Sequence, residues 1–134
     1  ATSRVSAHYG VGLDGEIHQY VKEKDTAYHC GKVQDPTWKS LVAGTNPNLY
    51  TIGVEHEGKG GAAWPEQMFL TSVQLVADIC KRNQIPVDDQ HIVGHHEIYT
   101  GHACPGAGWD KAAYIEAVKN AGSVKDPAGV PSTT

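Results

Sequence analysis

The sequence predicts an α/β domain in which a central mixed β-sheet is flanked by helices. Three observations lead to this class. An Asp14-Gly15 pair separates two alternating segments, which predicts a β-hairpin. Apolar residues recur at helical spacing over residues 65–82. Short apolar segments then alternate with helical ones, in the order hairpin, strand, helix, strand, helix, which is typical of helices packed on a sheet.

The hairpin comes first in the chain. Residues 4–12 alternate loosely and lead into Leu13-Asp14-Gly15-Glu16, and residues 16–21 form the returning strand. Asp-Gly is a strong turn signal because both central positions can adopt positive φ. His18 alternates with Ile17, so we expect the His18 side chain on the solvated face.

A long connection and a central strand follow the hairpin. Residues 22–49 have no sustained period and include a loop rich in Gly, Asn and Pro at 44–48. A loop of this length in a compact domain is usually functional. Residues 49–57 then have the composition of a central strand, which runs into the glycine-rich segment 58–61.

The clearest helix begins at Pro65 and continues to about Arg82. We expect it to end before Pro86, because the residue preceding a proline avoids the helical conformation. A short strand over 91–94 and a second helix over 109–120 complete the domain. The predicted core positions are Phe69, Val73, Val76 and Cys80, widened by Leu70 and Ile79, with Ala112, Ile115 and Val118 on the second helix.

Composition limits the number of domains and the kinds of partner. The chain has 134 residues, of which 40% are hydrophobic and 19% charged, and this suits one globular domain. We assign residues 1–121 to that domain and residues 122–134 to a linker-like tail. The net charge is −4 and no Lys/Arg block occurs, so we expect no nucleic-acid partner. No apolar run approaches the ~20 residues of a membrane span, so we expect no membrane partner.

Residues 92–106 contain several side chains of the types that bind metal ions in proteins. They contain His95, His96, His102, Glu97 and Cys104, and they follow an apolar pair that predicts the end of a buried strand. A rigid strand end that presents imidazole and thiolate groups suits a tetrahedral zinc site with an open position. The alternative is a surface loop that is merely rich in histidine.

The other two cysteines are Cys30 and Cys80. They could form a pair, or both could be buried thiols. Cys80 falls on the apolar face of the predicted helix, which favours a packed thiol at that position.

Four segments of the chain form a recognisable series. They are VSAHY at 5–9 with DGEIHQYV at 14–21, AYHCG at 27–31, TIGVE at 51–55, and VGHHEIYTGHACPG at 93–106. In this order they resemble the zinc amidases of the N-acetylmuramoyl-L-alanine amidase type 2 group, which share a fold with peptidoglycan recognition proteins and phage lysozyme-like amidases. The resemblance extends to about residue 120, so residues 1–121 are expected to form an amidase-like catalytic domain.

The resemblance implies hydrolysis of the amide between the lactyl group of N-acetylmuramic acid and L-alanine in peptidoglycan. It implies a zinc ion held by two histidines and a Cys or Asp, with His95 and Cys104 at the second and third ligand positions. Glu55 matches a carboxylate near the metal and would act as the general base. His102 would stabilise the oxyanion. Tyr28 and His29 would line the substrate groove. His8 is a further substrate-binding candidate, with a hydrogen-bonded core histidine as its alternative.

One expected feature is not found. The family's first zinc ligand is a histidine on a strand that precedes the hairpin, and this chain begins at Ala1 without that strand. Three explanations stay open: a fragment or processed form, a substitute histidine, or a protein that binds peptidoglycan without catalysis. The available substitutes are His8, His29, His56 and His96. Because adjacent strand residues face opposite ways, His56 is not expected to share a face with Glu55.

We therefore expect a monomeric zinc-dependent peptidoglycan amidase, of the phage endolysin or bacterial autolysin kind. It would be secreted or act at the bacterial cell wall. The alternative function is a non-catalytic peptidoglycan-binding module of the same fold with an incomplete metal site. A third candidate, a structural zinc domain, requires a closed four-ligand site, and no fourth ligand occurs at a natural spacing.

Overall fold

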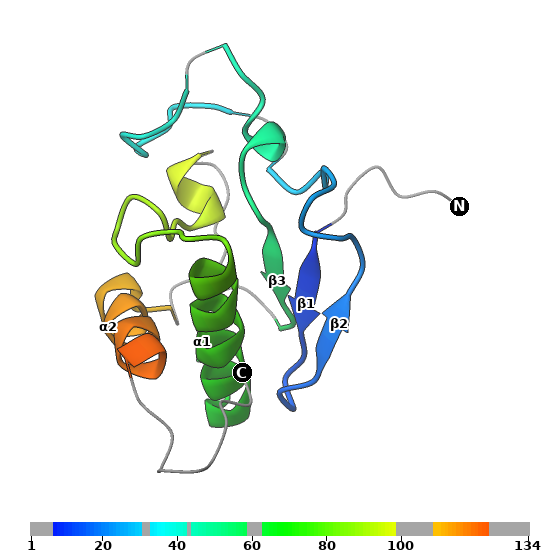
Figure 1. The fold of residues 1–134 in the computed structure, drawn as a ribbon, viewed down its shortest axis with the longest axis vertical. Helices are drawn as coiled ribbons and strands as arrows, with labels where there is room; N and C mark the ends of the chain where they lie inside the picture. The colour runs from blue at the N-terminus through cyan, green and yellow to red at the C-terminus, as the bar shows by residue number, and fades with distance from the viewer. Residues whose placement is uncertain (1–6, 31–32, 43, 59–62, 99–108, 124–134) are drawn as a thin grey trace.

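The computed structural model describes residues 7–30, 33–42, 44–58, 63–98 and 109–123 (Figure 1). Three short strands, two α-helices and two 3₁₀ turns make up its regular structure. In chain order they are β1 (Tyr9–Val11), β2 (Ile17–Gln19), η1 (Pro47–Leu49), β3 (Val54–His56), α1 (Glu66–Arg82), η2 (His95–Glu97) and α2 (Lys111–Ser123).

The sheet has the order β2-β1-β3, with β1 antiparallel to β2 and parallel to β3. This confirms the predicted mixed sheet. Gly10 is paired with His18 on one side and with Glu55 on the other, so these three residues share one face of the sheet. Neither described helix packs on that face, which we call the open face; His18 and Glu55 are both exposed there.

The hairpin turn forms at the predicted place. The Gly15 N–H donates to the Gly12 carbonyl at 2.9 Å, and the Gly12 N–H donates to the Glu16 carbonyl at 2.8 Å. Of the two central turn residues, Gly15 has positive φ, at 84°, and Asp14 does not, although the Asp-Gly signal allowed it at both positions. A Cβ on Gly15 would lie 2.7 Å from Thr71 Oγ1, which shows that the turn is docked on α1.

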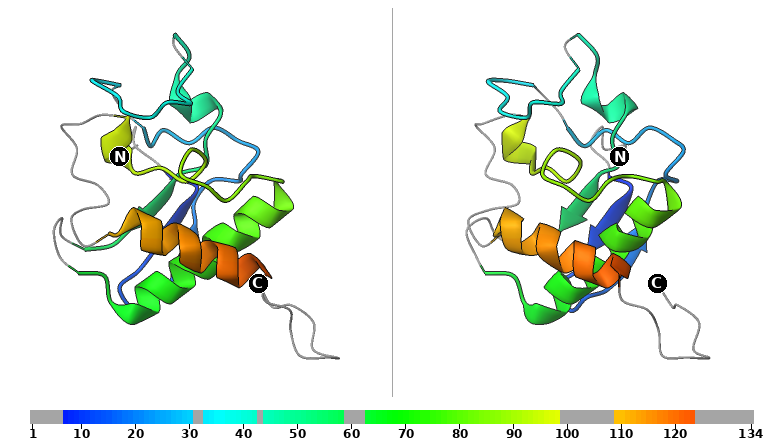
Figure 2. Two further views of the ribbon diagram at one scale, coloured as in Figure 1. Left: turned by 90° about the vertical axis from the view of Figure 1, so that its left-hand side faces the viewer. Right: turned by 60° about the vertical axis from the view of Figure 1, so that its left-hand side comes forward.

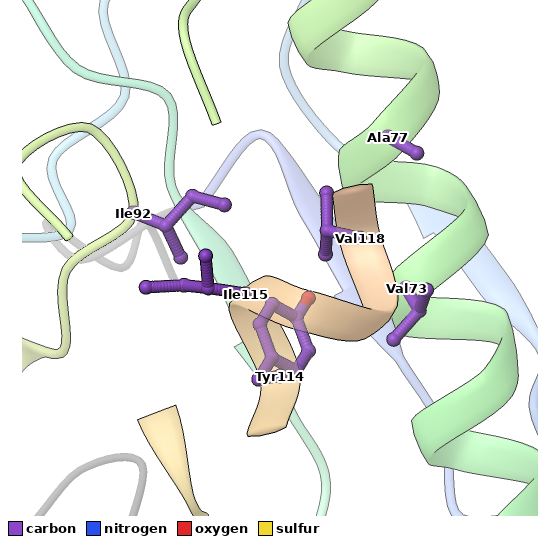
Figure 3. Packing of buried hydrophobic residues seen from close by; sticks show 6 residues of the cluster. All are labelled: Val73, Ala77, Ile92, Tyr114, Ile115 and Val118. Atoms are coloured by element: carbon purple, nitrogen blue, oxygen red, sulfur yellow. The ribbon is translucent and has the colours of Figure 1, made fainter. Parts of the chain in front are cut away.

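The described elements form three layers, with α1 between the sheet and α2 (Figures 1 and 2). One side of α1 packs on the sheet through Met68, Leu75 and Ile79, which contact Tyr9 and Val11. The other side packs on α2 (Figure 3), through a cluster that comprises Val73, Ala77, Ile92, Tyr114, Ile115 and Val118.

The bounds predicted for α1 are confirmed to within one residue, but the predicted single core stripe is wrong in part. Leu70 is 49% exposed, whereas Met68 is almost fully buried. Phe69 and Val76 are partly buried and flank the cluster shared with α2. The physical reason is that α1 is covered on two sides, so its buried positions form two stripes, and Leu70 falls outside both, beyond the stripe that faces α2.

Two strand predictions also differ from the structure. Residues 91–94 form no strand, because the Asp88 carboxylate accepts from the backbone N–H groups of Gln90 and His91 and closes a turn. The Ile92 N–H donates to the Asp88 carbonyl at 3.1 Å instead of to a sheet neighbour. The strand predicted over 49–57 is shortened to β3, since Leu49 belongs to η1 and the Tyr50 N–H closes that turn on the Pro47 carbonyl.

A charged cluster fastens the segment after β2 to the end of α1. The Glu23 carboxylate accepts from both terminal nitrogens of Arg82, at 3.0 and 2.8 Å, from Asn83 Nδ2 at 2.7 Å, and from the Tyr9 hydroxyl. Burial by itself would raise the pKa of Glu23, but the hydrogen bonds from Arg82, Tyr9 and Asn83 outweigh it and hold the pKa at about 2. This cluster closes the core at the end of α1.

Candidate functional site

A cavity of about 1780 Å³ adjoins β3 and collects most of the described site residues predicted from the sequence. Tyr28, His29, Glu55 and His95 all contribute to its wall, while His8 does not. Both 3₁₀ turns lie at the end of the molecule where β3 begins (Figures 1 and 2), which places η1 and η2 beside this part of the cavity.

Glu55 projects from the middle of β3 on the open face. Its partner on β1 is Gly10, whose missing side chain leaves room for an aromatic ring: a Cβ on Gly10 would lie 2.9 Å from the Tyr20 ring. Tyr20 is itself 60% exposed. The carboxylate therefore stands on an accessible surface beside an exposed tyrosine.

His56 faces the opposite way from Glu55, as predicted. Its Nε2 lies 2.6 Å from Ser72 Oγ on α1, and its ring stacks on Trp64 with ring centroids 4.1 Å apart. Burial lowers the pKa of His56 to about 4. Because this ring is committed to the helix side of the sheet, His56 is no substitute metal ligand for the open face.

His29 is held in one tautomer by its neighbours. The Thr51 hydroxyl donates to the Pro47 carbonyl at 2.8 Å, so its oxygen accepts from His29 Nε2–H at 3.1 Å. His29 Nδ1 is then the acceptor for the Cys30 thiol, 3.4 Å away. Burial, followed by the proximity of His8 and His95, lowers the pKa of His29 to about 4. The imidazole is therefore neutral at pH 7.

His95 begins η2, where a strand end had been expected. Its Nε2 contacts the Cys30 carbonyl at 2.5 Å. A carbonyl can only accept, so Nε2 carries the proton and the lone pair of the neutral ring is on Nδ1. Metal-binding histidines almost always donate their second ring N–H in this way. His95 therefore suits a zinc ligand that coordinates through Nδ1.

The turn that carries His95 is itself braced. The Glu97 carboxylate accepts from the Gly94 N–H at 2.8 Å and from Lys111 Nζ at 2.8 and 2.9 Å. The Glu97 carbonyl accepts from the backbone N–H of Thr37, in the long connection, at 2.8 Å. Glu97 is thus a structural residue that ties η2 to α2 and to the long connection.

His8 has the structural role that was its alternative. It is 1% exposed, its Nδ1 accepts from the Gly53 N–H at 3.0 Å, and its Nε2–H donates to the Asp25 carbonyl at 2.8 Å. Both ring nitrogens are engaged by backbone, and the ring packs edge-on against His29. The structure does not bring His8 to the cavity wall.

The remaining predicted residues are placed as follows. Tyr28 is 57% exposed at the cavity mouth. His96, a possible substitute ligand, packs edge-on against Trp109 instead of lining the cavity. His102 and Cys104 lie outside the described residues. Within the described ranges, no three His, Cys, Asp or Glu side chains form a metal-binding group, and Cys30 and Cys80 are both free buried thiols.

Two supporting residues were not predicted from the sequence. Asn48, in η1, and Thr51 support the backbone and ring of the His29-Cys30 segment. The sequence singled out this region only through the loop rich in Gly, Asn and Pro, which ends at Asn48, and the TIGVE segment, which begins at Thr51.

Comparison of the sequence with models of known protein families identifies the class of protein to which this fold and site belong. The family model described as N-acetylmuramoyl-L-alanine amidase matches residues 1–107, and the chain belongs to that family. This confirms the resemblance drawn from the four sequence segments.

Individual relatives agree with this assignment. The chain is 34% identical to N-acetylmuramoyl-L-alanine amidase A of Achromobacter lyticus over 87 residues, which are 63% of this chain and 41% of that protein. It is 28% identical to the 1,6-anhydro-N-acetylmuramyl-L-alanine amidase AmpD of Haemophilus influenzae over 117 residues, which are 87% of this chain and 60% of that protein. The chain thus spans about half the length of these relatives.

Solved structures confirm the fold. A selenomethionine AmpD derivative superposes with a TM-score of 0.71 at 27% identity, covering 85% of this chain and 59% of that one. The amidase AmiD of E. coli, solved with anhydro-N-acetylmuramic acid-L-Ala-D-γ-Glu-L-Lys, gives a TM-score of 0.72 at 22% identity, covering 87% and 49%. In this chain, no described helix has the length and apolar character needed to cross a membrane.

Proposed function

We propose that this protein is a zinc-dependent amidase that hydrolyses the bond between N-acetylmuramic acid and L-alanine in peptidoglycan. The observation that carries the proposal is that Glu55 and His95, which match the base and a metal ligand of the family, line one cavity. Family membership over residues 1–107 supports the same activity.

Zinc would be held by His95 and Cys104 together with a further ligand. When bound, it would polarise the scissile carbonyl and lower the pKa of a bound water towards about 7. The tautomer of His95 fits this role, because its Nε2 proton is directed to the Cys30 carbonyl and the ring lone pair is on Nδ1.

The protein's own groups would move the protons and orient the substrate. Glu55 would accept a proton from the attacking water and deliver it to the leaving amine of L-alanine, so that the C–N bond breaks without expelling an amide anion. His102 would donate a hydrogen bond to the oxyanion. Tyr28, exposed at the cavity mouth, would contact the stem peptide or sugar. His29 would form a neutral wall of the groove.

Substrate class and location follow from the same proposal. The AmiD structure contains a muramyl tripeptide, and both curated relatives are named as muramyl-L-alanine amidases. We expect this chain to act on muramyl peptides of the bacterial cell wall, as an endolysin or autolysin would, and to act as a monomer.

The second candidate is a peptidoglycan-binding module with an incomplete zinc site. One observation favours it: within the described residues, His8 and His56 are committed to structural hydrogen bonds, and His29 is engaged at both ring nitrogens. A module of this kind would bind muramyl peptides in the same cavity but would not cleave them.

Zinc content and product release separate the two candidates. We would measure zinc per chain by atomic emission, with and without added zinc, and follow release of L-alanyl peptide from purified peptidoglycan. The amidase predicts one zinc and peptide release in wild type, both lost in His95→Ala and Cys104→Ala. Glu116→Gln, which changes an exposed carboxylate on α2 outside the cavity wall, is the control and should change neither. Peptidoglycan binding without zinc uptake or release would establish the binding module.

A further inference from the structure

The side chain of Asn48 is buried against the backbone of the His29-Cys30 segment. It is 6% exposed, and its Oδ1 accepts from two consecutive backbone N–H groups, those of His29 at 3.1 Å and Cys30 at 2.9 Å. Its own N–H donates to Asn46 Oδ1 at 3.0 Å, which caps η1 and orients the turn. A side-chain amide oxygen can accept both bonds because it has two lone pairs.

Cys30 connects Asn48 to His95, because its backbone N–H binds Asn48 and its carbonyl binds His95. Cys30 is 2% exposed, receives the Asn48 hydrogen bond on its nitrogen, and presents its oxygen to His95 Nε2. Because both groups belong to one buried residue, a shift of the Cys30 backbone would move the acceptor of the His95 proton. The connection spans three segments that are far apart in the sequence.

We propose that Asn48 is a positioning residue for the metal ligand His95. By holding Cys30 in place, it keeps the Cys30 carbonyl aligned with His95 Nε2–H and so keeps the His95 lone pair on Nδ1. This inference rests on the proposed function, in which His95 binds zinc. Groups that orient a metal-binding histidine through hydrogen bonds, without touching the metal, typically contribute 10–100-fold to metal affinity.

The same turn supports the neighbouring histidine, which strengthens the assignment. The Pro47 carbonyl accepts from the Thr51 hydroxyl, whose oxygen accepts from His29 Nε2–H. η1 therefore sets the proton positions of His29 through Thr51 and those of His95 through Asn48 and Cys30. A turn that merely closed a loop would need neither of these contacts.

The test measures zinc affinity and the His95 tautomer in Asn48 variants. Asn48→Ala removes both acceptor bonds, Asn48→Asp keeps an oxygen that accepts both, and Val118→Ala is a destabilising control in the cluster between α1 and α2. Zinc alone is the probe, by competition with a chromophoric chelator. Long-range ¹H–¹⁵N correlation spectra of the metal-free proteins report which His95 nitrogen carries the proton.

We expect Asn48→Ala to weaken zinc binding by about 10–100-fold and to give a mixture of His95 tautomers. Asn48→Asp should recover zinc binding to within a few-fold of wild type, and Val118→Ala should leave both measurements unchanged. If Asn48→Ala lowers the Tm but keeps the zinc affinity and the Nε2–H tautomer, the positioning role is overturned. Should Asn48→Ala not fold, Asn48→Ser, with a shorter polar arm, takes its place.

The two proposals fail separately. If wild type takes up no zinc, the amidase assignment fails, and the His95 tautomer in the metal-free variants still decides whether Asn48 positions that ring. If wild type binds zinc and Asn48→Ala binds it equally well, the amidase assignment stands and the role of Asn48 is excluded.

Discussion

The ring of His29 lies directly over Gly53, so closely that a Cβ on Gly53 would be 2.4 Å from His29 Cγ. Gly53 immediately precedes β3 and lies two residues before Glu55, so its missing side chain is on the same side of the chain as the Glu55 carboxylate. The missing side chain of Gly53 therefore leaves the space that the His29 ring occupies.

We predict that Gly53→Ala displaces His29 and costs about 1–3 kcal/mol of stability, since overpacking of a tight contact forces ring and backbone apart. Peptide release should fall with it. Denaturant unfolding and the His29 imidazole signals would measure the two effects. Gly122→Ala is the matched control, because a Cβ on Gly122 of α2 meets nothing within 4 Å. Equal tolerance of both changes would contradict the predicted contact.

Removing the Glu55 carboxylate should separate zinc binding from turnover. Glu55 is not placed among the proposed zinc ligands, so Glu55→Ala should keep its zinc. It should lose roughly 10²–10⁴-fold in the rate of amide hydrolysis, the usual contribution of a general base. Zinc analysis and peptide release on the same preparation would check this. Loss of zinc in Glu55→Ala would instead make Glu55 a ligand.

His56 should make the fold sensitive to mild acid. Its pKa is about 4 in the folded protein, below the ordinary histidine value of about 6.5, so the unfolded chain binds more protons between these pH values. Stability from this residue is present above about pH 6.5 and is lost as the pH falls towards 4, by about 2 kcal/mol at pH 5. His56→Gln should reduce the slope of unfolding free energy against pH, measured by urea titration from pH 7 to 5. An unchanged slope would show that His56 does not titrate as described.

The Glu23 cluster should act in a lower pH window. Because the pKa of Glu23 is about 2 in the folded protein, against 4.5 ordinarily, its stabilisation is present above about pH 4.5 and is lost as the pH falls through 2. Glu23→Gln should cost about 1–3 kcal/mol at pH 7, the usual effect of weakening charge-assisted hydrogen bonds. Glu16→Gln, at an exposed pair with His18, should cost under about 0.5 kcal/mol. Matching values for the two variants, from urea unfolding, would refute the role of the cluster.

The sequence by itself determined the local features and the family. The turn at Gly15 and the extent of α1 depend on backbone preferences of neighbouring residues, which a sequence expresses directly. The opposite facing of Glu55 and His56 follows from strand geometry alone. The family was likewise recognised from motifs that each span a few residues, and the family model confirmed it.

Only the tertiary structure decided which side chains meet. Asn48 reaches Cys30 across 18 residues of sequence, and Cys30 reaches His95 across 65. The second buried face of α1 exists because α2 packs there, so a single-stripe pattern could not reveal it. His8 and His56 looked like spare ligands in the sequence, and they became structural only when folding placed backbone and Ser72 beside their ring nitrogens. Hydrogen-bond partners are set by proximity in space, which local sequence preferences do not encode.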